Sequence, residues 1–403
     1  MFREETLDNG LRIVAEIEES AVTAGMGFFV RTGARDEPSE IMGVSHFLEH
    51  MMFKGTERRS AEEIDRAFDD LGAEHNAFTT GEMTAFWTAG LPEVLPECQD
   101  ILSDILRPSL RQEDFDAEKG VILEEIAMYD DQPFWVLYER TMEQCFSSSG
   151  LGHRVLGTAE TITAMQRDDM VAYFEDRYSA DNTIVAMSGK LDFDEMVDRV
   201  AALCGAWPTT GASRDDTTVL PQSIDLRDTS DDVHQHYLLW LMPGVPVADD
   251  RRYAAAALAS ILGSGDNSRF HWALVNPGLA EQASASIEPL DGSGLQAITA
   301  VCAPQQTEEV ESLLASTMRD LVESLTEDDL LRVRNKAATA MAISSERSAG
   351  RMQRLGGLVA STGTYRSLED ELARIDALQL GDLKSVADAF PWNATVRASL
   401  SPA

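Results

Sequence analysis

Residues 43–56 read GVSHFLEHMMFKGT, and this stretch decides the interpretation of the whole chain. His46 and His50 are four residues apart, so on a helix both imidazoles project from one face, one turn apart. Two imidazoles placed in this way can bind one metal ion, as they do in zinc sites. Glu49 lies three residues after His46 on that face, within reach of a water at the metal. The stretch therefore predicts a metal-binding helix that also carries a general base.

The HxxEH spacing is a specific signal. With seven histidines in 403 residues, and with all 69 acidic residues counted as glutamate, about 0.02 such motifs are expected by chance. The alternative interpretation is two histidines on a helix surface beside a glutamate, without a metal. HxxEH is the inverted relative of HExxH and is a zinc-peptidase signature, which favours metal binding.

A third ligand is expected on a second helix. In residues 115–131, FDAEKGVILEEIAMYDD, a helical period places Glu118, Ile122 and Glu125 on one stripe, whereas Glu124 points elsewhere. Carboxylates among apolar positions cost free energy unless a partner such as a metal compensates them. Glu125 is the better ligand candidate, and Glu118, two turns earlier, would support a ligating histidine. For Glu118, a solvated acid in the first helical turn is an equal alternative.

Composition limits the classes of protein. The chain has 44% hydrophobic and 25% charged residues, as globular proteins do, and its length corresponds to two or three domains. A net charge of −36 disfavours nucleic acid and anionic membranes as partners. No apolar run is long enough to span a bilayer, and acidic residues occupy the N-terminus where a signal peptide would need apolar ones, so we expect a cytoplasmic protein. The four scattered cysteines fit reduced, buried positions.

Both halves of the chain follow one order of elements: strand, helix, strand pair, helices, strand. We therefore expect an α+β protein of two related domains, each an antiparallel sheet with helices on one face, which together form a clamshell. The predicted ranges are 1–210 for the metal-binding domain, 211–232 for a Thr/Ser/Asp-rich linker, and 233–403 for the related second domain.

GVSHFLEHMMFKGT, with Glu125 inside EKGVILEEI 75 residues after His50, resembles the pitrilysin/insulinase family of zinc peptidases (inverzincins). This family includes the mitochondrial processing peptidase and bacterial two-domain relatives. The resemblance implies one Zn²⁺ per chain, held by His46, His50 and Glu125. It also implies that Glu49 is the general base and that Glu118 is a supporting acid in catalysis.

The resemblance further implies that HNAFTT, residues 75–80, is an edge strand in which Asn76 and Ala77 contact the substrate backbone. An extended peptide can add to an exposed sheet edge through main-chain hydrogen bonds, which demand little of its sequence. Without the resemblance, Asn76 would be interpreted as an ordinary residue at a strand end.

The second half departs from the family pattern. Active single-chain members carry an arginine and, seven residues later, a tyrosine that bind the substrate carbonyl; these positions hold Leu274 and Glu281. Neither side chain can donate a hydrogen bond at neutral pH, and losing such a donor costs about 10²–10³ in rate. We therefore expect a homodimer or heterodimer in which another chain completes the site, or a slow enzyme.

The resulting hypothesis is a zinc endopeptidase for peptides or unfolded segments, with the negative surface favouring basic ones. Two alternatives are a non-catalytic structural or assembly subunit of the same fold and a metal-dependent hydrolase of small molecules.

Overall fold

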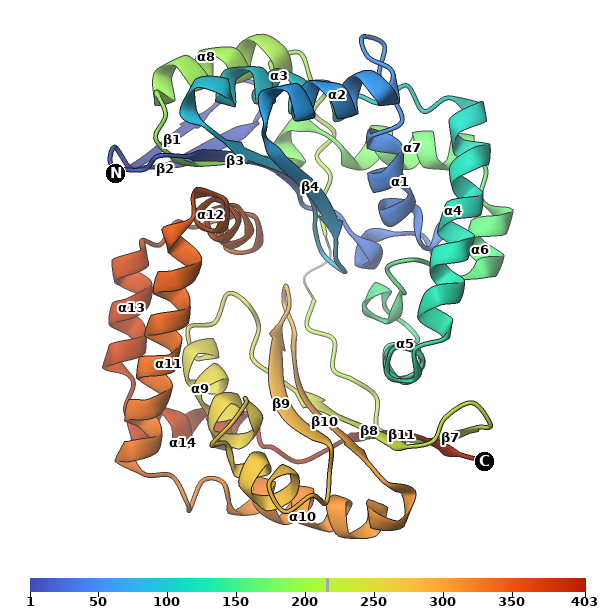
Figure 1. Ribbon diagram of the computed structural model, residues 1–403, viewed down its shortest axis with the longest axis vertical. Helices are drawn as coiled ribbons and strands as arrows, with labels where there is room; N and C mark the ends of the chain where they lie inside the picture. The colour runs from blue at the N-terminus through green and yellow to red at the C-terminus, as the bar shows by residue number, and fades with distance from the viewer. Residues whose placement is uncertain (215–216) are drawn as a thin grey trace. The chain divides into compact units, whose positions relative to one another are not determined.

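The computed structural model describes residues 1–214 and 217–403; residues 215 and 216, inside the predicted linker, lie outside the described residues. Packing divides the chain into two units (Figure 1). The first comprises Met1–Ala127, His153–Asp215 and Ala342–Ser367, and the second comprises Met128–Gly152, Asp216–Met341 and Leu368–Ala403. Each unit thus includes a helical segment from the other half of the sequence. The predicted ranges 1–210 and 233–403 follow chain order and do not include this exchange.

The first unit is built on a six-stranded sheet with the order β1-β2-β6-β3-β5-β4. Only β2 and β6 pair in parallel; the other neighbours are antiparallel. A parallel pair requires a crossover, and here most of the unit's helices lie between β2 and β6 in the chain. The strands are β1 (Phe2–Thr6), β2 (Arg12–Ile17), β3 (Ala24–Val30), β4 (Glu74–Thr79), β5 (Thr84–Gly90) and β6 (Thr183–Gly189).

Helices cover one face of this sheet and bury alternate strand residues such as Met26 and Phe28 against Phe47 and Phe68. The helices are α1 (Val44–Met52), α2 (Ala61–Leu71), α3 (Leu95–Ile105), α4 (Gln112–Asp130, whose last residues join the second unit), α6 (Ala159–Ala164), α7 (Arg167–Arg177) and α8 (Phe193–Cys204). Short helical turns are η1 (Ala34–Asp36), η2 (Ser39–Ile41), η3 (Pro92–Val94) and η5 (Ala180–Asn182).

The opposite face of the sheet is covered by α12 (Ser348–Thr362), which comes from the last quarter of the chain (Figure 1). Met352 and Leu355 on this helix pack against Phe29 of β3 and Val14 of β2, all fully buried. β3 and β6 are buried along their whole length, as strands covered on both faces are.

The second unit contains a five-stranded sheet with the order β7-β11-β8-β10-β9, in which only β7 and β11 pair in parallel. Its strands are β7 (Ile224–Ser230), β8 (His236–Pro243), β9 (Gln282–Pro289), β10 (Gly294–Cys302) and β11 (Val396–Pro402). β7 forms an edge of this sheet, so the later part of the predicted linker 211–232 is a strand. Its alternation of half-buried and exposed residues explains why its composition resembles a linker.

Helices cover both faces of the second sheet as well. Trp240 of β8 packs with Leu258 on one face, and Leu239 and Leu241 pack with Leu137 of α5 on the other. The helices are α5 (Pro133–Cys145), α9 (Arg252–Gly263), α10 (Thr307–Asp320), α11 (Glu327–Glu346, whose last residues join the first unit), α13 (Leu368–Ala377) and α14 (Leu380–Ala389). Shorter turns are η4 (Gly150–Gly152), η6 (His271–Val275) and η7 (Pro304–Gln306).

These observations confirm an α+β protein of two related sheet-and-helix units. Two details differ from the sequence-based expectation: each sheet is mixed rather than fully antiparallel, and helices cover two faces rather than one. The clamshell stays a prediction. All four cysteines are free and buried, as expected. No helix within the described ranges is long and apolar enough to cross a membrane.

Candidate metal centre

Helix α1 carries three of the predicted site residues: His46, Glu49 and His50. It starts after Gly43, whose φ of 96° lies in the left-handed region that glycine tolerates best. The buried carboxylate of Glu37 accepts hydrogen bonds from the N–H groups of Gly43 and Ser45, each at 2.7 Å. Burial raises the pKa of Glu37 to about 8, while these two N–H donors act in the opposite direction. Glu37 thereby satisfies two helix-start N–H groups that would otherwise lack partners.

The two imidazoles and one carboxylate of the predicted metal site lie together. Glu125 Oε2, on α4, is 3.8 Å from His46 Nε2 and 3.7 Å from His50 Nε2. One ligand atom from each residue lies within 4.8 Å of the other two, and no other group of His, Cys, Asp and Glu within the described ranges meets this criterion. Ligands about 2.0–2.2 Å from one zinc ion are roughly 3.4 Å apart, so small side-chain rotations would suffice to bind it.

The His46 side chain is in the protonation state that a metal ligand requires. Burial, and then the nearby His50, lower the pKa of His46 to about 4, so its imidazole is neutral at pH 7. His46 Nδ1 is buried and has no partner within the described part of the chain. His46 and His50 stand with ring centres 4.7 Å apart. A neutral imidazole is the form that ligates zinc, so His46 fits such an ion.

Glu118 lies beside the metal ligands rather than among them. Its Oε1 is 2.8 Å from His50 Nδ1, and its Oε2 is 2.7 Å from Lys54 Nζ. Burial opposes the charge on Glu118, but the hydrogen bonds from Lys54 and His50 outweigh it and lower its pKa. A hydrogen bond donated by His50 Nδ1–H to an ionised Glu118 would leave Nε2 as the lone pair that faces Glu125.

Glu49 is not one of the three grouped ligands. Thr79 Oγ1, on β4, donates a 2.5 Å hydrogen bond to Glu49 Oε2, which links the edge strand to α1. Burial raises the pKa of Glu49, and this outweighs the effects of Thr79 and His50. A carboxylate whose pKa is raised binds a proton more readily, which suits a general base.

Asn76 and Ala77 lie on β4, an edge strand of the first unit's sheet, as the sequence predicts. The Asn76 side chain accepts a hydrogen bond at 2.8 Å from the backbone N–H of Ala77. In antiparallel pairs successive N–H groups alternate between the partner strand and the outside. The Ala77 N–H is therefore held by a side chain rather than by β5, and it faces the open edge.

Residues 12–159 match Insulinase (Peptidase family M16), and residues 164–337 match the Peptidase M16 inactive domain. An uncharacterized zinc protease of Streptomyces coelicolor is 32% identical, over 96% of this chain and 86% of that protein. The chain belongs to peptidase family M16. The predicted resemblance to the insulinase family is thereby confirmed.

More distant relatives are also M16 proteins. A probable mitochondrial-processing peptidase subunit beta of Arabidopsis thaliana is 26% identical over 98% of this chain and 77% of that protein. The crystal structure of a protease from Helicobacter pylori covers 100% of both chains with a TM-score of 0.91 at 20% identity, which shows a shared fold. Relatives named zinc proteases indicate a peptidase-type, zinc-using protein.

The M16 inactive-domain match includes the two positions at which the sequence departs from active members. Leu274 is fully buried in the core of the second unit. Glu281 precedes β9 and accepts a hydrogen bond from the Gln235 side chain. Both positions therefore make contacts within their own unit, and neither offers a hydrogen-bond donor to a carbonyl oxygen.

Three residues around the M16 site were missed by the sequence analysis: Glu37, Lys54 and Thr79. Lys54 lies one turn after His50, so helical spacing could have suggested it. Glu37 and Thr79 reach α1 from a turn and an edge strand, and no spacing rule within one element indicates such partners.

Proposed function

We propose that this chain is a zinc-dependent endopeptidase that cleaves peptides or unfolded segments. The observation that carries the proposal is the grouping of His46 Nε2, His50 Nε2 and Glu125 Oε2 beside an independently placed Glu49. Three protein ligands with one open position are typical of catalytic rather than structural zinc sites. When bound, the ion would act as a Lewis acid that polarises the scissile carbonyl and lowers the pKa of water.

Each residue has a separate part in this proposal. His46, His50 and Glu125 would hold the ion, and Glu118 would fix the His50 tautomer from behind. Glu49 would accept a proton from the attacking water and return it to the leaving amine. The Thr79 hydroxyl occupies one oxygen of Glu49, so the other oxygen is the one available to the proton.

The substrate backbone would add to β4 as an extra strand. Asn76 Oδ1 now accepts the outward N–H of Ala77, and a peptide carbonyl could take its place without leaving that N–H unpaired. Main-chain pairing of this kind selects extended segments and not folded surfaces. The net charge of −36 supports a preference for basic peptides.

We further propose that a second chain, identical or different, supplies the missing hydrogen-bond donors. The burial of Leu274 and the acidic character of Glu281 support this, because neither can act as a donor. A non-catalytic assembly subunit is the alternative, and the match to an inactive M16 domain is the observation that favours it.

The test is cleavage of an unstructured, lysine-rich peptide by the wild type and by Glu49→Gln, each loaded with zinc and assayed at several protein concentrations. We expect the wild type to cleave and Glu49→Gln to bind zinc without cleaving. Activity that rises more steeply than protein concentration would indicate that two chains form the site. A zinc-loaded wild type that cleaves no peptide, alone or with a second M16 chain, would favour the assembly subunit.

A further inference from the structure

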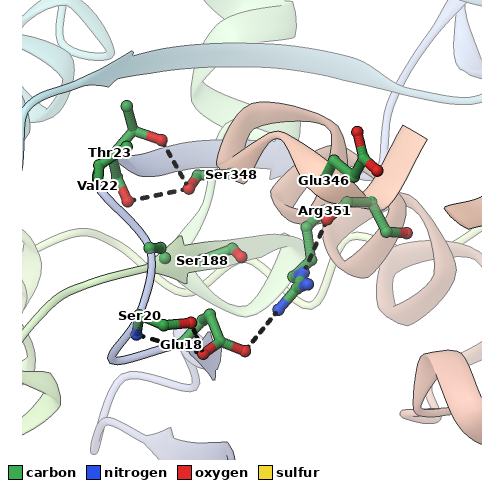
Figure 2. A pocket seen from close by; sticks show the side chains of 11 residues that line it. Glu18, Ser20, Val22, Thr23, Ser188, Glu346, Ser348 and Arg351 are labelled. Atoms are coloured by element: carbon green, nitrogen blue, oxygen red, sulfur yellow. Dashed lines mark hydrogen bonds and ion pairs between the residues drawn. The ribbon is translucent and has the colours of Figure 1, made fainter. Parts of the chain in front are cut away.

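A separate polar cavity lies in the first unit (Figure 2). Its volume is about 340 Å³, which is the volume that roughly eleven water molecules occupy in liquid water. Three segments line it: the loop between β2 and β3, the end of β6, and the junction of α11 and α12. None of its lining residues belongs to the metal centre, so the inference drawn from it does not depend on the proposed peptidase activity.

Two hydroxyl groups that line this cavity are buried and lack protein partners. Ser188 is 0% exposed and Ser345 is 3% exposed, and neither Oγ has a hydrogen-bond partner within the described part of the chain. The neighbouring Ser348 differs, because its Oγ donates to the backbone oxygen of Thr23 at 2.9 Å. A buried hydroxyl without a partner costs about 1–3 kcal/mol, so rotation of either side chain toward a ligand in the cavity would relieve that cost.

The lining also contains one cation, Arg351, whose Nε lies 3.9 Å from Oε2 of Glu16 behind the cavity wall. Arg351 Nε donates to the Ser345 backbone oxygen at 3.2 Å. Its Nη1 is 3.7 Å from Glu18 Oε2, which is an ion pair longer than a hydrogen bond. The terminal nitrogens of a guanidinium form a fork that matches a carboxylate. Arg351 can therefore accept a carboxylate ligand while it keeps its bond to the backbone.

Two carboxylates line the same cavity. The Glu18 carboxylate is held by Ser20, whose Oγ and N–H donate to Oε1 at 2.6 and 3.3 Å. Glu346 comes from the end of α11. Figure 2 shows Glu18, Ser188 and Arg351 around one part of the cavity, with Glu346 beyond Arg351. With one cation and two anions, the lining attracts an ammonium group as well as a carboxylate.

We propose that this cavity binds a small zwitterion, namely a free amino acid or a dipeptide. Its carboxylate would pair with Arg351 and, after rotation of the two serine side chains, accept hydrogen bonds from Ser188 and Ser345. Its ammonium would pair with Glu18, and Glu346 would add to the negative potential at the cavity. This arrangement gives each unpartnered polar group a partner of the matching kind. A purely anionic ligand would meet the two glutamates, and a purely cationic one would meet Arg351.

The first test compares four probes by calorimetric titration of the full chain: L-serine, glycylglycine, N-acetyl-L-serine and L-serinamide. We expect at least one of the two zwitterions to bind. The acetylated probe lacks the ammonium and the amide lacks the carboxylate, so each should bind at least tenfold more weakly. Equal binding of either analogue would overturn the zwitterion assignment, and no binding of any probe at millimolar concentration would overturn the site.

The second test uses variants. Ser188→Ala removes a hydroxyl that has no partner among the residues the structure describes, so it should leave folding intact and weaken binding of the zwitterion severalfold. Glu346→Gln, at an exposed position, should lower the affinity for the zwitterion. It should not raise the affinity for L-serinamide. Ser286→Ala, at an exposed position on β9 of the second unit, is the control and should change nothing. Unchanged affinity in both cavity variants would contradict the proposal.

Discussion

Glu118 Oε1 lies 2.8 Å from His50 Nδ1, and the other oxygen of Glu118 lies 2.7 Å from Lys54 Nζ. This places a buried, ion-paired carboxylate directly behind one of the two imidazoles of the candidate metal site. Such a contact fixes both the ring orientation and the nitrogen that carries the proton.

Glu118→Gln should therefore weaken zinc binding. The amide keeps the size of the side chain but loses the charge that pairs with Lys54 and orients His50, and such changes cost about 10–100-fold in metal affinity. Competition with a chromogenic chelator measures this directly. Glu124→Gln, at an exposed position on the same helix, is the matched control. Equal zinc affinity in wild type and Glu118→Gln would show that the charge of Glu118 is not needed to orient His50 for metal binding.

Glu37→Gln should destabilise the start of α1. The glutamine has one acceptor oxygen for two N–H groups, and its amide would face the second of them, which costs about 1–3 kcal/mol for an unpaired buried group. Urea unfolding of the metal-free protein above about pH 8, where Glu37 is ionised, checks the loss. Glu40→Gln, exposed in the adjacent turn η2, should be neutral. If both variants unfold at the same urea concentration, Glu37 does not anchor the helix.

Two neighbouring glycines of α12 should respond in opposite ways to alanine. A Cβ at Gly356 would lie 2.1 Å from Phe29 Cε2, and the buried ring must shift, so Gly356→Ala should lose about 1–3 kcal/mol. A Cβ at Gly357 would meet nothing within 4 Å, so Gly357→Ala should gain up to ~1 kcal/mol from helix propensity. Thermal unfolding of both variants tests how closely α12 packs on the sheet. If Gly356→Ala raised the unfolding temperature, α12 would pack less closely on Phe29 than the structure shows.

Asp329 should contribute to acid sensitivity in the second unit. Burial opposes its charge, but hydrogen bonds from Arg269, Arg332 and Thr326 lower its pKa to about 2. Since the folded pKa lies below the unfolded value of 3.8, the stabilisation is present above about pH 4 and is lost as the pH falls toward 2. Over that range it amounts to about 2 kcal/mol.

The corresponding measurement is the difference in unfolding free energy between wild type and Asp329→Asn at several pH values. The difference should shrink as the pH falls from 4 to 2. Asp328 is exposed and directly precedes Asp329, so Asp328→Asn should show no such trend. A constant difference for Asp329→Asn across this range would contradict the lowered pKa.

The chemistry of the site could be predicted because it is local. His46, Glu49 and His50 lie within five residues, and helical geometry alone places them on one face. Glu125 required a second helix, whose amphipathic stripe was readable, and the structure brings its carboxylate to both imidazoles. The edge position of β4 followed from the family resemblance rather than from spacing. The cytoplasmic location and the dimer stay predictions.

The features that could not be predicted depend on contacts between distant segments. The sequence of residues 348–362 predicts a helix. It contains no signal that this helix, α12, covers the sheet formed by β2, β3 and β6. The same holds for α5 and the second sheet. A sign was present in β3, because AGMGFFV is apolar throughout, and continuous apolar runs are typical of strands that are buried on both faces.

The most direct test of the account is the zinc content of the purified chain after dialysis, measured by elemental analysis for wild type, His50→Ala and Glu125→Gln. We predict about one zinc per chain in the wild type, and its loss in both variants while their circular dichroism is unchanged. A folded wild type that binds no zinc, or variants that retain it, would contradict the claim that His46, His50 and Glu125 form one metal site.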